Sequence, residues 1–231
     1  MKKQKQSKRF WLSLMALPML CATLTLTACG SDNDGDGDGG GGIKSVIPDD
    51  IRNKMKDYIT FYEGDTPPNI EGVYLVSPYV YVYDSDGGFE AGERISDYYF
   101  EFTNQNSNDN TCYFRRIIAS QTALDSGKAY IIGNGNNFTL YLTSAGTSEG
   151  VYVKRVVVVS GTKTANGIKD FRHAFVVTEK GDDPENKVVD VGTFRVFKDQ
   201  DGLAENSTWP TSARAEGALK AKRQLKTELT K

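Results

Sequence analysis

Few side chains in this sequence have the types and spacing that chemistry requires. His173 is the only histidine, which excludes a zinc site built from several histidines. The turn-like run Gly133-Asn134-Gly135-Asn136 lacks the lysine and the following helix of a phosphate-binding loop. Paired carboxylates for glycoside hydrolysis are left open, because their separation in space is not fixed by sequence. We therefore expect a protein that is not an enzyme and that uses no metal and no cofactor.

Cys29 is the residue with the most specific surroundings. Residues 1–9 carry five positive charges and no acid, residues 10–26 are apolar, and small residues precede the cysteine, as in a secretory signal. The sequence Leu26-Thr27-Ala28-Cys29 is similar to the lipobox of bacterial lipoproteins. This resemblance implies cleavage before Cys29 and a diacylglycerol group on its sulfur. A lone transmembrane anchor is the alternative, although the apolar stretch is short for a span and contains Pro18.

The chain that follows the signal is acidic and has one free thiol. Removing the five signal cations leaves 23 basic and 30 acidic residues, a net charge of −7. That balance argues against a nucleic-acid partner. Cys112 is the only cysteine left besides Cys29, so no internal disulfide can form, and we expect Cys112 to be a small buried core residue.

Residues 30–42, GSDNDGDGDGGGG, have no apolar side chain and are predicted to be a flexible tether. Acidic tracts behind a lipidated cysteine resemble a surface-export signal of some Gram-negative gut bacteria, which implies an outward-facing protein on the outer membrane. Asp32, Asp34 and Asp36 match the start of a calcium loop, but Ile43 stands where that loop needs a glutamate. A tether is the preferred interpretation.

A helix is predicted over Pro48–Tyr62. Pro48 suits a first helical turn, and the acids that follow it complement the helix dipole. Ile51, Met55, Tyr58, Ile59 and Tyr62 recur at helical spacing and should form one apolar packing stripe.

Beyond Pro67-Pro68 the apolar residues alternate with period two, which indicates strands. Turn residues separate the runs, and the short links favour antiparallel neighbours. Eight strands that close on themselves would form a small barrel able to hold one ligand. We therefore predict an all-β fold with an eight-stranded antiparallel up-and-down barrel and an N-terminal helix, with a two-sheet β-sandwich as the alternative. The predicted strands are Gly72–Tyr83, Asp97–Thr103, Thr111–Ser120, Lys128–Ile132, Asn137–Ser144, Val151–Ser160, Lys169–Glu179 and Lys187–Phe197.

The predicted organisation has five parts. The tail is interpreted as solvated and partly helical, since residues 211–231 hold six cations and two acids without a continuous apolar stripe. The parts are a signal peptide (1–28), the lipidated Cys29 with its tether (29–47), the helix and Pro-Pro segment (48–68), the β-barrel domain (69–202) and the basic tail (203–231).

The segment Tyr62–Pro78, YEGDTPPNIEGVYLVSP, resembles the opening segment of lipocalin-like bacterial surface lipoproteins. Gly72-x-Tyr74 is similar to the lipocalin Gly-x-Trp motif, with tyrosine in place of tryptophan. The resemblance implies that Tyr74 packs at the base of a barrel and that the long loop Asp84–Arg94 is lid-like. Such families generally bind small ligands or have no assigned activity.

The leading functional hypothesis is an outer-membrane-anchored, lipocalin-like lipoprotein that binds a small apolar or glycan-type ligand without catalysis. Tyr74, Phe100, Phe102 and Phe194 are predicted to line its interior. The alternative is a structural or interaction subunit of a cell-surface assembly, with a filled barrel whose outer face meets an outer-membrane protein partner.

Overall fold

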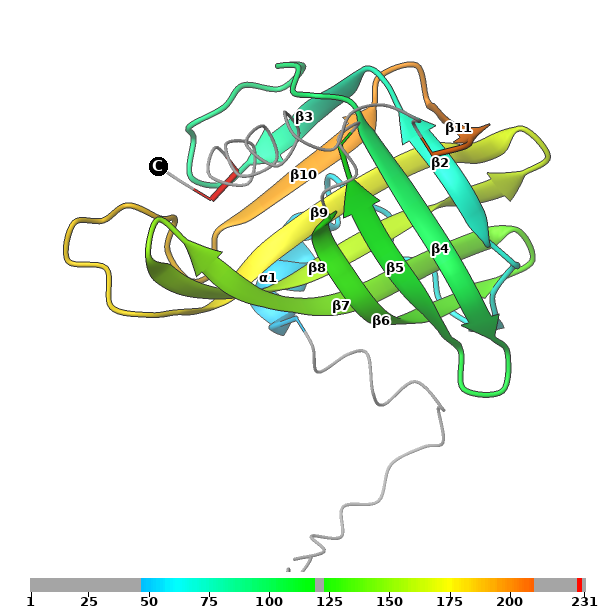
Figure 1. Ribbon diagram of the computed structural model, residues 1–231, viewed down its shortest axis with the longest axis horizontal. Helices are drawn as coiled ribbons and strands as arrows, with labels where there is room; N and C mark the ends of the chain where they lie inside the picture. The colour runs from blue at the N-terminus through cyan, green and yellow to red at the C-terminus, as the bar shows by residue number, and fades with distance from the viewer. Residues whose placement is uncertain (1–46, 119–122, 210–227, 230–231) are drawn as a thin grey trace, which may run out of the picture. The chain divides into compact units, whose positions relative to one another are not determined.

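The computed structural model describes residues 47–118, 123–209 and 228–229 (Figure 1). Over these residues the chain is all-β with one short helix, which confirms the predicted fold class. The signal region, Cys29 and the tether lie outside the described residues. The elements are α1 (Asp49–Met55), β1 (Asp65–Thr66), β2 (Gly72–Val76), β3 (Tyr79–Asp84), β4 (Tyr98–Asn106), β5 (Thr111–Ile117), β6 (Ala123–Asn134), β7 (Asn137–Ser148), β8 (Val151–Thr164), β9 (Gly167–Lys180), β10 (Phe194–Asp199) and β11 (Leu203–Ser207).

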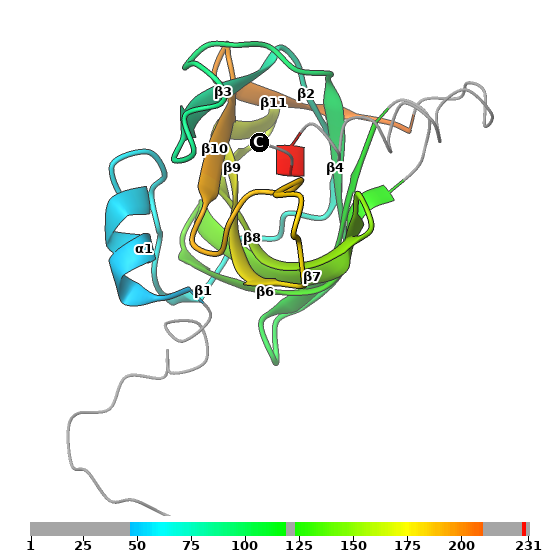
Figure 2. The ribbon, with the colours of Figure 1, turned by 90° about the vertical axis from the view of Figure 1, so that its left-hand side faces the viewer.

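The eleven strands form a single sheet, so the two-sheet sandwich alternative was wrong. The strand order is β11-β2-β4-β5-β6-β7-β8-β9, and β11 also pairs with β9, which closes these eight strands into a ring (Figure 2). All pairings are antiparallel except that of β1 with β6. The ring is not a regular barrel, because the first part of β9 pairs with β11 while its later part pairs with β10, which in turn carries β3.

Several predicted strands are longer in the structure, as where Lys128–Ile132 lies within β6, and two others are corrected more fundamentally. The run Gly72–Tyr83 is divided into β2 and β3, with a cis Ser77–Pro78 peptide between them. The run Lys187–Phe197 was wrong in its first half, since β10 begins only at Phe194. There the Asp183 carboxylate accepts the backbone N–H groups of Lys187 and Val188 and holds the segment as a loop.

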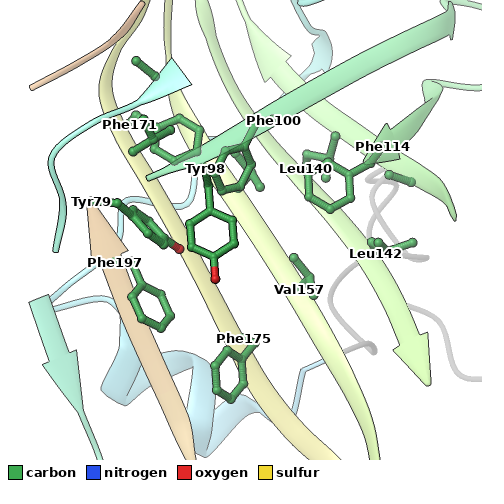
Figure 3. Packing of buried hydrophobic residues seen from close by; sticks show 14 of the residues in the cluster. Tyr79, Tyr98, Phe100, Phe114, Leu140, Leu142, Val157, Phe171, Phe175 and Phe197 are labelled. Carbon is green, nitrogen blue, oxygen red and sulfur yellow. The ribbon is translucent and has the colours of Figure 1, made fainter. Parts of the chain in front are cut away.

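The ring encloses the main hydrophobic cluster. Side chains of one parity point inward along each strand, so Phe100 and Phe102 of β4 meet Phe114 of β5 at ring-centroid distances of 6.1 and 5.7 Å. Figure 3 shows Phe100 and Phe114 packed in the enclosed space together with Tyr79, Tyr98 and Phe197. Cys112 lies in the same cluster as a buried free cysteine, as predicted, and burial raises the pKa of its thiol to about 12.

Helix α1 packs outside the ring, against a second cluster on the outer faces of β7–β10. Ile51, Met55 and Ile59 of the predicted stripe belong to this cluster or pack against it. The predicted length was wrong, because α1 ends at Met55. Beyond the helix, the backbone N–H of Tyr62 donates to Thr139 Oγ1 at 2.7 Å, so contacts with β7 hold the chain away from a continued helix.

The tail prediction is corrected at both of its described ends. β11 extends the sheet past residue 202, and Trp209 behind it donates from Nε1 to Glu101 Oε1 at 2.8 Å on the ring. Glu228 and Leu229 are buried rather than solvated. The tail residues between Trp209 and Glu228 are not among the described residues.

Within the described ranges, no helix has the length and apolar character that crossing a membrane would require.

Candidate functional site

Charged side chains occupy inward-facing positions at one part of the ring. Arg116 follows Phe114 by two residues on β5, and Arg155 precedes Val157 by two residues on β8, so both share the inward parity of their strands. We call this group the charged cluster: Asp84, Arg116, Asp125, Arg155, Arg195 and Glu228. All six side chains are buried. Burying a charge costs free energy unless the charge is paired. The pairing among these six side chains therefore shows which charges the cluster neutralises by itself.

Asp125 of β6 joins two of the arginines. Its Oδ2 accepts from Arg116 Nε at 2.9 Å, while its Oδ1 accepts from Arg155 Nη2 at 2.5 Å and from Ser144 Oγ at 3.0 Å. Burial opposes ionisation of Asp125, but the positive charges of Arg155 and Arg116 outweigh it and hold the pKa of this carboxyl well below its usual range. Asp125 is therefore a carboxylate at neutral pH.

Glu228 enters the cluster from the C-terminal end of the chain. Its two carboxylate oxygens accept from Arg116 Nη1 and Nη2 at 3.0 and 2.8 Å, the two-pronged geometry in which arginine binds carboxylates best. Tyr98 donates its hydroxyl to Glu228 Oε1 at 3.3 Å, and Arg195 Nη1 donates to the Glu228 main-chain oxygen. Figure 2 shows this segment, in red, within the outline of the ring.

The loop after β3 completes the cluster. Asp84 pairs with Arg195 at 3.0 Å and also accepts the backbone N–H groups of Asp86 and Gly88, which fixes the start of the loop. Phe89 of this loop stacks on Tyr81 with ring centroids 4.4 Å apart, and the Arg195 guanidinium lies 4.8 Å from the Phe89 centroid. The loop therefore covers the cluster with an aromatic ring.

The charges of the cluster balance only when Glu228 is included. Among the described residues of the strands, three guanidinium groups (Arg116, Arg155 and Arg195) face two carboxylates (Asp84 and Asp125). This leaves one positive charge, which the Glu228 carboxylate neutralises. Without Glu228, the strands would carry one buried guanidinium charge with no carboxylate to neutralise it.

His173 supports this site without carrying charge. Its Nδ1 lies 2.6 Å from the Tyr79 hydroxyl, and its ring stacks on Phe197. Burial lowers the pKa of His173 well below its usual range, and the Arg116 charge lowers it further, so the imidazole is neutral. Three buried atoms near the cluster have no hydrogen-bond partner among the described residues: His173 Nε2, Arg155 Nη1 and the Tyr81 hydroxyl.

The four predicted interior residues divide into two groups. Tyr74, Phe100 and Phe102 lie in the enclosed cluster, and the Tyr74 hydroxyl donates to the Ile70 carbonyl at 2.9 Å. The placement of Phe194 inside was wrong, because it faces outward and packs 5.3 Å from the ring of Tyr83. Alternation along β10 explains the difference: Phe197 faces inward, so Phe194, three residues earlier, has the opposite parity and faces outward with Val196.

The arginines are the candidate site residues that the sequence analysis did not identify. A charged residue in line with inward apolar neighbours, such as Arg116 after Phe114, was a usable signal. Glu228 had no such signal, because its partner Arg116 is 112 residues away in the chain.

Other candidate sites have less support. Gly146-Thr147-Ser148-Glu149-Gly150 has the spacing of a serine-nucleophile turn, but it forms the hairpin between β7 and β8, without the helix that such a turn needs. No group of three or more potential metal ligands occurs within the described ranges. A hollow of about 320 Å³ lies outside the ring, lined by Lys56, Tyr58 and Arg172 among others. None of its lining residues has an unpartnered buried atom among those described.

A scan against protein-family models found no match, and neither a search of curated proteins nor a search of solved structures found one.

The neutral His173 predicts how stability depends on pH. The folded-state pKa of His173 is lowered, so below about pH 6.5 only the unfolded chain gains this proton, and stability falls by up to about 1.4 kcal/mol per pH unit. Urea unfolding between pH 5 and pH 8 should show this slope. A His173→Gln variant should lose that part of the slope, whereas Tyr79→Phe should keep it. Equal slopes in the parent and His173→Gln would contradict a neutral buried imidazole.

Proposed function

We propose that this chain is a lipid-anchored, non-catalytic binding protein of the outer membrane surface that takes a small amphipathic acid into a lipocalin-like barrel. The observation that carries the proposal is the two-pronged binding of a carboxylate by Arg116 inside an aromatic-lined ring. Arginine recognises carboxylates through just this paired geometry, and it keeps its charge when buried.

The surroundings of Arg116 specify the rest of the ligand. The Arg116 guanidinium lies 5.0 Å from the Tyr98 ring centroid, and Phe175 lies 5.5 Å from the Arg155 guanidinium. Sites for small molecules typically combine apolar walls with a few polar groups that orient the ligand. An acid with a hydrocarbon body matches both features. The apolar or glycan-type ligand expected from the sequence is thereby restricted to an apolar molecule with an acidic group.

The anchoring part of the proposal rests on the N-terminal sequence. The lipobox-like Leu26-Thr27-Ala28-Cys29 supports lipid attachment at Cys29, and the acidic tract behind it supports display at the outer surface. A membrane-held binding protein would capture its ligand next to the cell. The lipid anchor would make the membrane the main partner of this protein. An outer-membrane protein partner belongs to the alternative function.

The alternative function is an interaction subunit with a filled barrel. Close packing of the enclosed aromatic cluster favours it, as do three exposed tyrosines, Tyr113, Tyr130 and Tyr152, on the outer surface. Exposed aromatic rings are enriched where proteins meet. The two functions differ in whether the purified protein binds a small acid.

The carboxylate preference can be tested with a matched pair of ligands. Dodecanoate should bind the full-length protein at least about tenfold more tightly than dodecanol in calorimetric titrations at pH 7.5, because a charge-assisted hydrogen bond contributes about 1.5–3 kcal/mol. Arg116→Lys should reduce this preference, since lysine keeps the charge but loses the paired donors. Arg115→Lys is the matched control, because Arg115 pairs with Glu101 away from the charged cluster. Equal binding of acid and alcohol would refute the proposal, and no binding of either would favour the filled subunit.

Lipid attachment has its own test. Cells that produce the full-length chain and are fed an alkyne analogue of palmitate should label it, and Cys29→Ala should abolish the label. Cys112→Ala should leave labelling unchanged, because Cys112 is buried in the folded protein. Labelling that persists in Cys29→Ala would contradict attachment at this residue.

A further inference from the structure

Glu228 and Leu229 are buried in the ring without being part of it. All eight strands of the ring pair without them, and the last strand ends at Ser207. Yet Leu229 belongs to the enclosed hydrophobic cluster, and its carbonyl accepts the Val189 N–H at 2.7 Å. The two residues are thus an addition to a framework that closes on its own.

Their chemistry is that of the ligand the site would take. Glu228 supplies a carboxylate to Arg116 and Tyr98, and Leu229 supplies a hydrocarbon side chain beside it. A carboxylate joined to an apolar group is an amphipathic acid in miniature. The neutral charge balance of the cluster depends on this one carboxylate.

The strands around the charged cluster have buried donors that Glu228 does not satisfy. Arg155 Nη1 and the Tyr81 hydroxyl are buried and have no hydrogen-bond partner among the described residues. Tyr81 lies close enough to the cluster for the Glu228 and Arg195 charges to act on its hydroxyl in opposite directions, after the larger effect of burial, which raises its pKa. A different acid could therefore accept hydrogen bonds from these two donors, which Glu228 does not do.

We propose that Glu228 and Leu229 are a dissociable internal ligand that occupies the acid-binding site and competes with the external acid. This inference rests on the proposed function for the identity of the competing ligand, but the binding of the tail can be tested separately. A competitor that fills the site about nine-tenths of the time weakens the apparent affinity for the external acid about tenfold.

Three chains test the competition with dodecanoate as the probe. A chain that ends at Thr227 should bind dodecanoate about tenfold more tightly than the full chain. The full-length variant Glu228→Gln should also bind more tightly, and it keeps the test decisive if the shortened chain does not fold. Glu205→Gln, at an exposed position on β11, is the matched control and should bind like the parent chain.

A synthetic peptide of residues 222–231 tests the tail without the acid. It should bind the chain that ends at Thr227 and displace dodecanoate from it, whereas the same peptide with Glu228→Gln should bind at least about tenfold more weakly. Fluorescence anisotropy of a labelled peptide gives the affinities directly.

The outcomes separate the two proposals. If dodecanoate binds the full chain, the Thr227-terminated chain and Glu228→Gln equally, the internal ligand is refuted while the binding function stands. If the peptide binds in a Glu228-dependent way but no chain binds dodecanoate, the internal ligand stands and the proposed function fails. If neither binds the folded ring, both are overturned.

Discussion

Positive charge buried inside the ring is the constraint on which the rest of the structure depends. Three guanidinium groups lie among aromatic side chains, where an unpaired charge would cost several kcal/mol. Asp125 and Asp84 contact all three groups but neutralise only two of the three positive charges, and each aspartate accepts further hydrogen bonds. The last carboxylate comes from Glu228, near the C-terminal end of the chain. The buried charges therefore balance only with one acid that the strands do not provide.

The ring geometry makes this constraint possible. Inward positions of β5 and β8 are mostly apolar, and Arg116 and Arg155 take the same parity as their apolar neighbours. The divided path of β9, which pairs with β11 and then β10, brings Arg195 and the loop after β3 to the same cluster. A neutral His173, hydrogen-bonded to Tyr79, packs against Phe197 beside these charges. The strand pairing and the aromatic packing thus meet at the charged cluster.

Much of the fold could be predicted from the sequence because alternation and turn residues are local signals. They predicted the all-β class, the hairpin at Gly133–Asn136 and an apolar packing stripe around Met55, which the structure places outside the ring. The errors come from long-range effects. Phe194 faces outward because it has the opposite parity to the inward Phe197, and the sequence does not show which parity of β10 faces inward. Thr139 accepts a hydrogen bond from the chain beyond Met55, and β11 forms although Leu203–Ser207 has weak strand propensity. The pairing of Glu228 with Arg116 spans 112 residues, so no local pattern predicts it.

The most direct measurement of this account is a double-mutant cycle between Arg116 and Glu228, made with Arg116→Met, Glu228→Gln and the double variant in urea unfolding. A buried pair in contact should give a coupling free energy of about 1.5–3 kcal/mol, with the double variant less destabilised than the sum of the single variants. Effects that add to within about 0.5 kcal/mol would contradict a buried ion pair between the ring and the C-terminal residues.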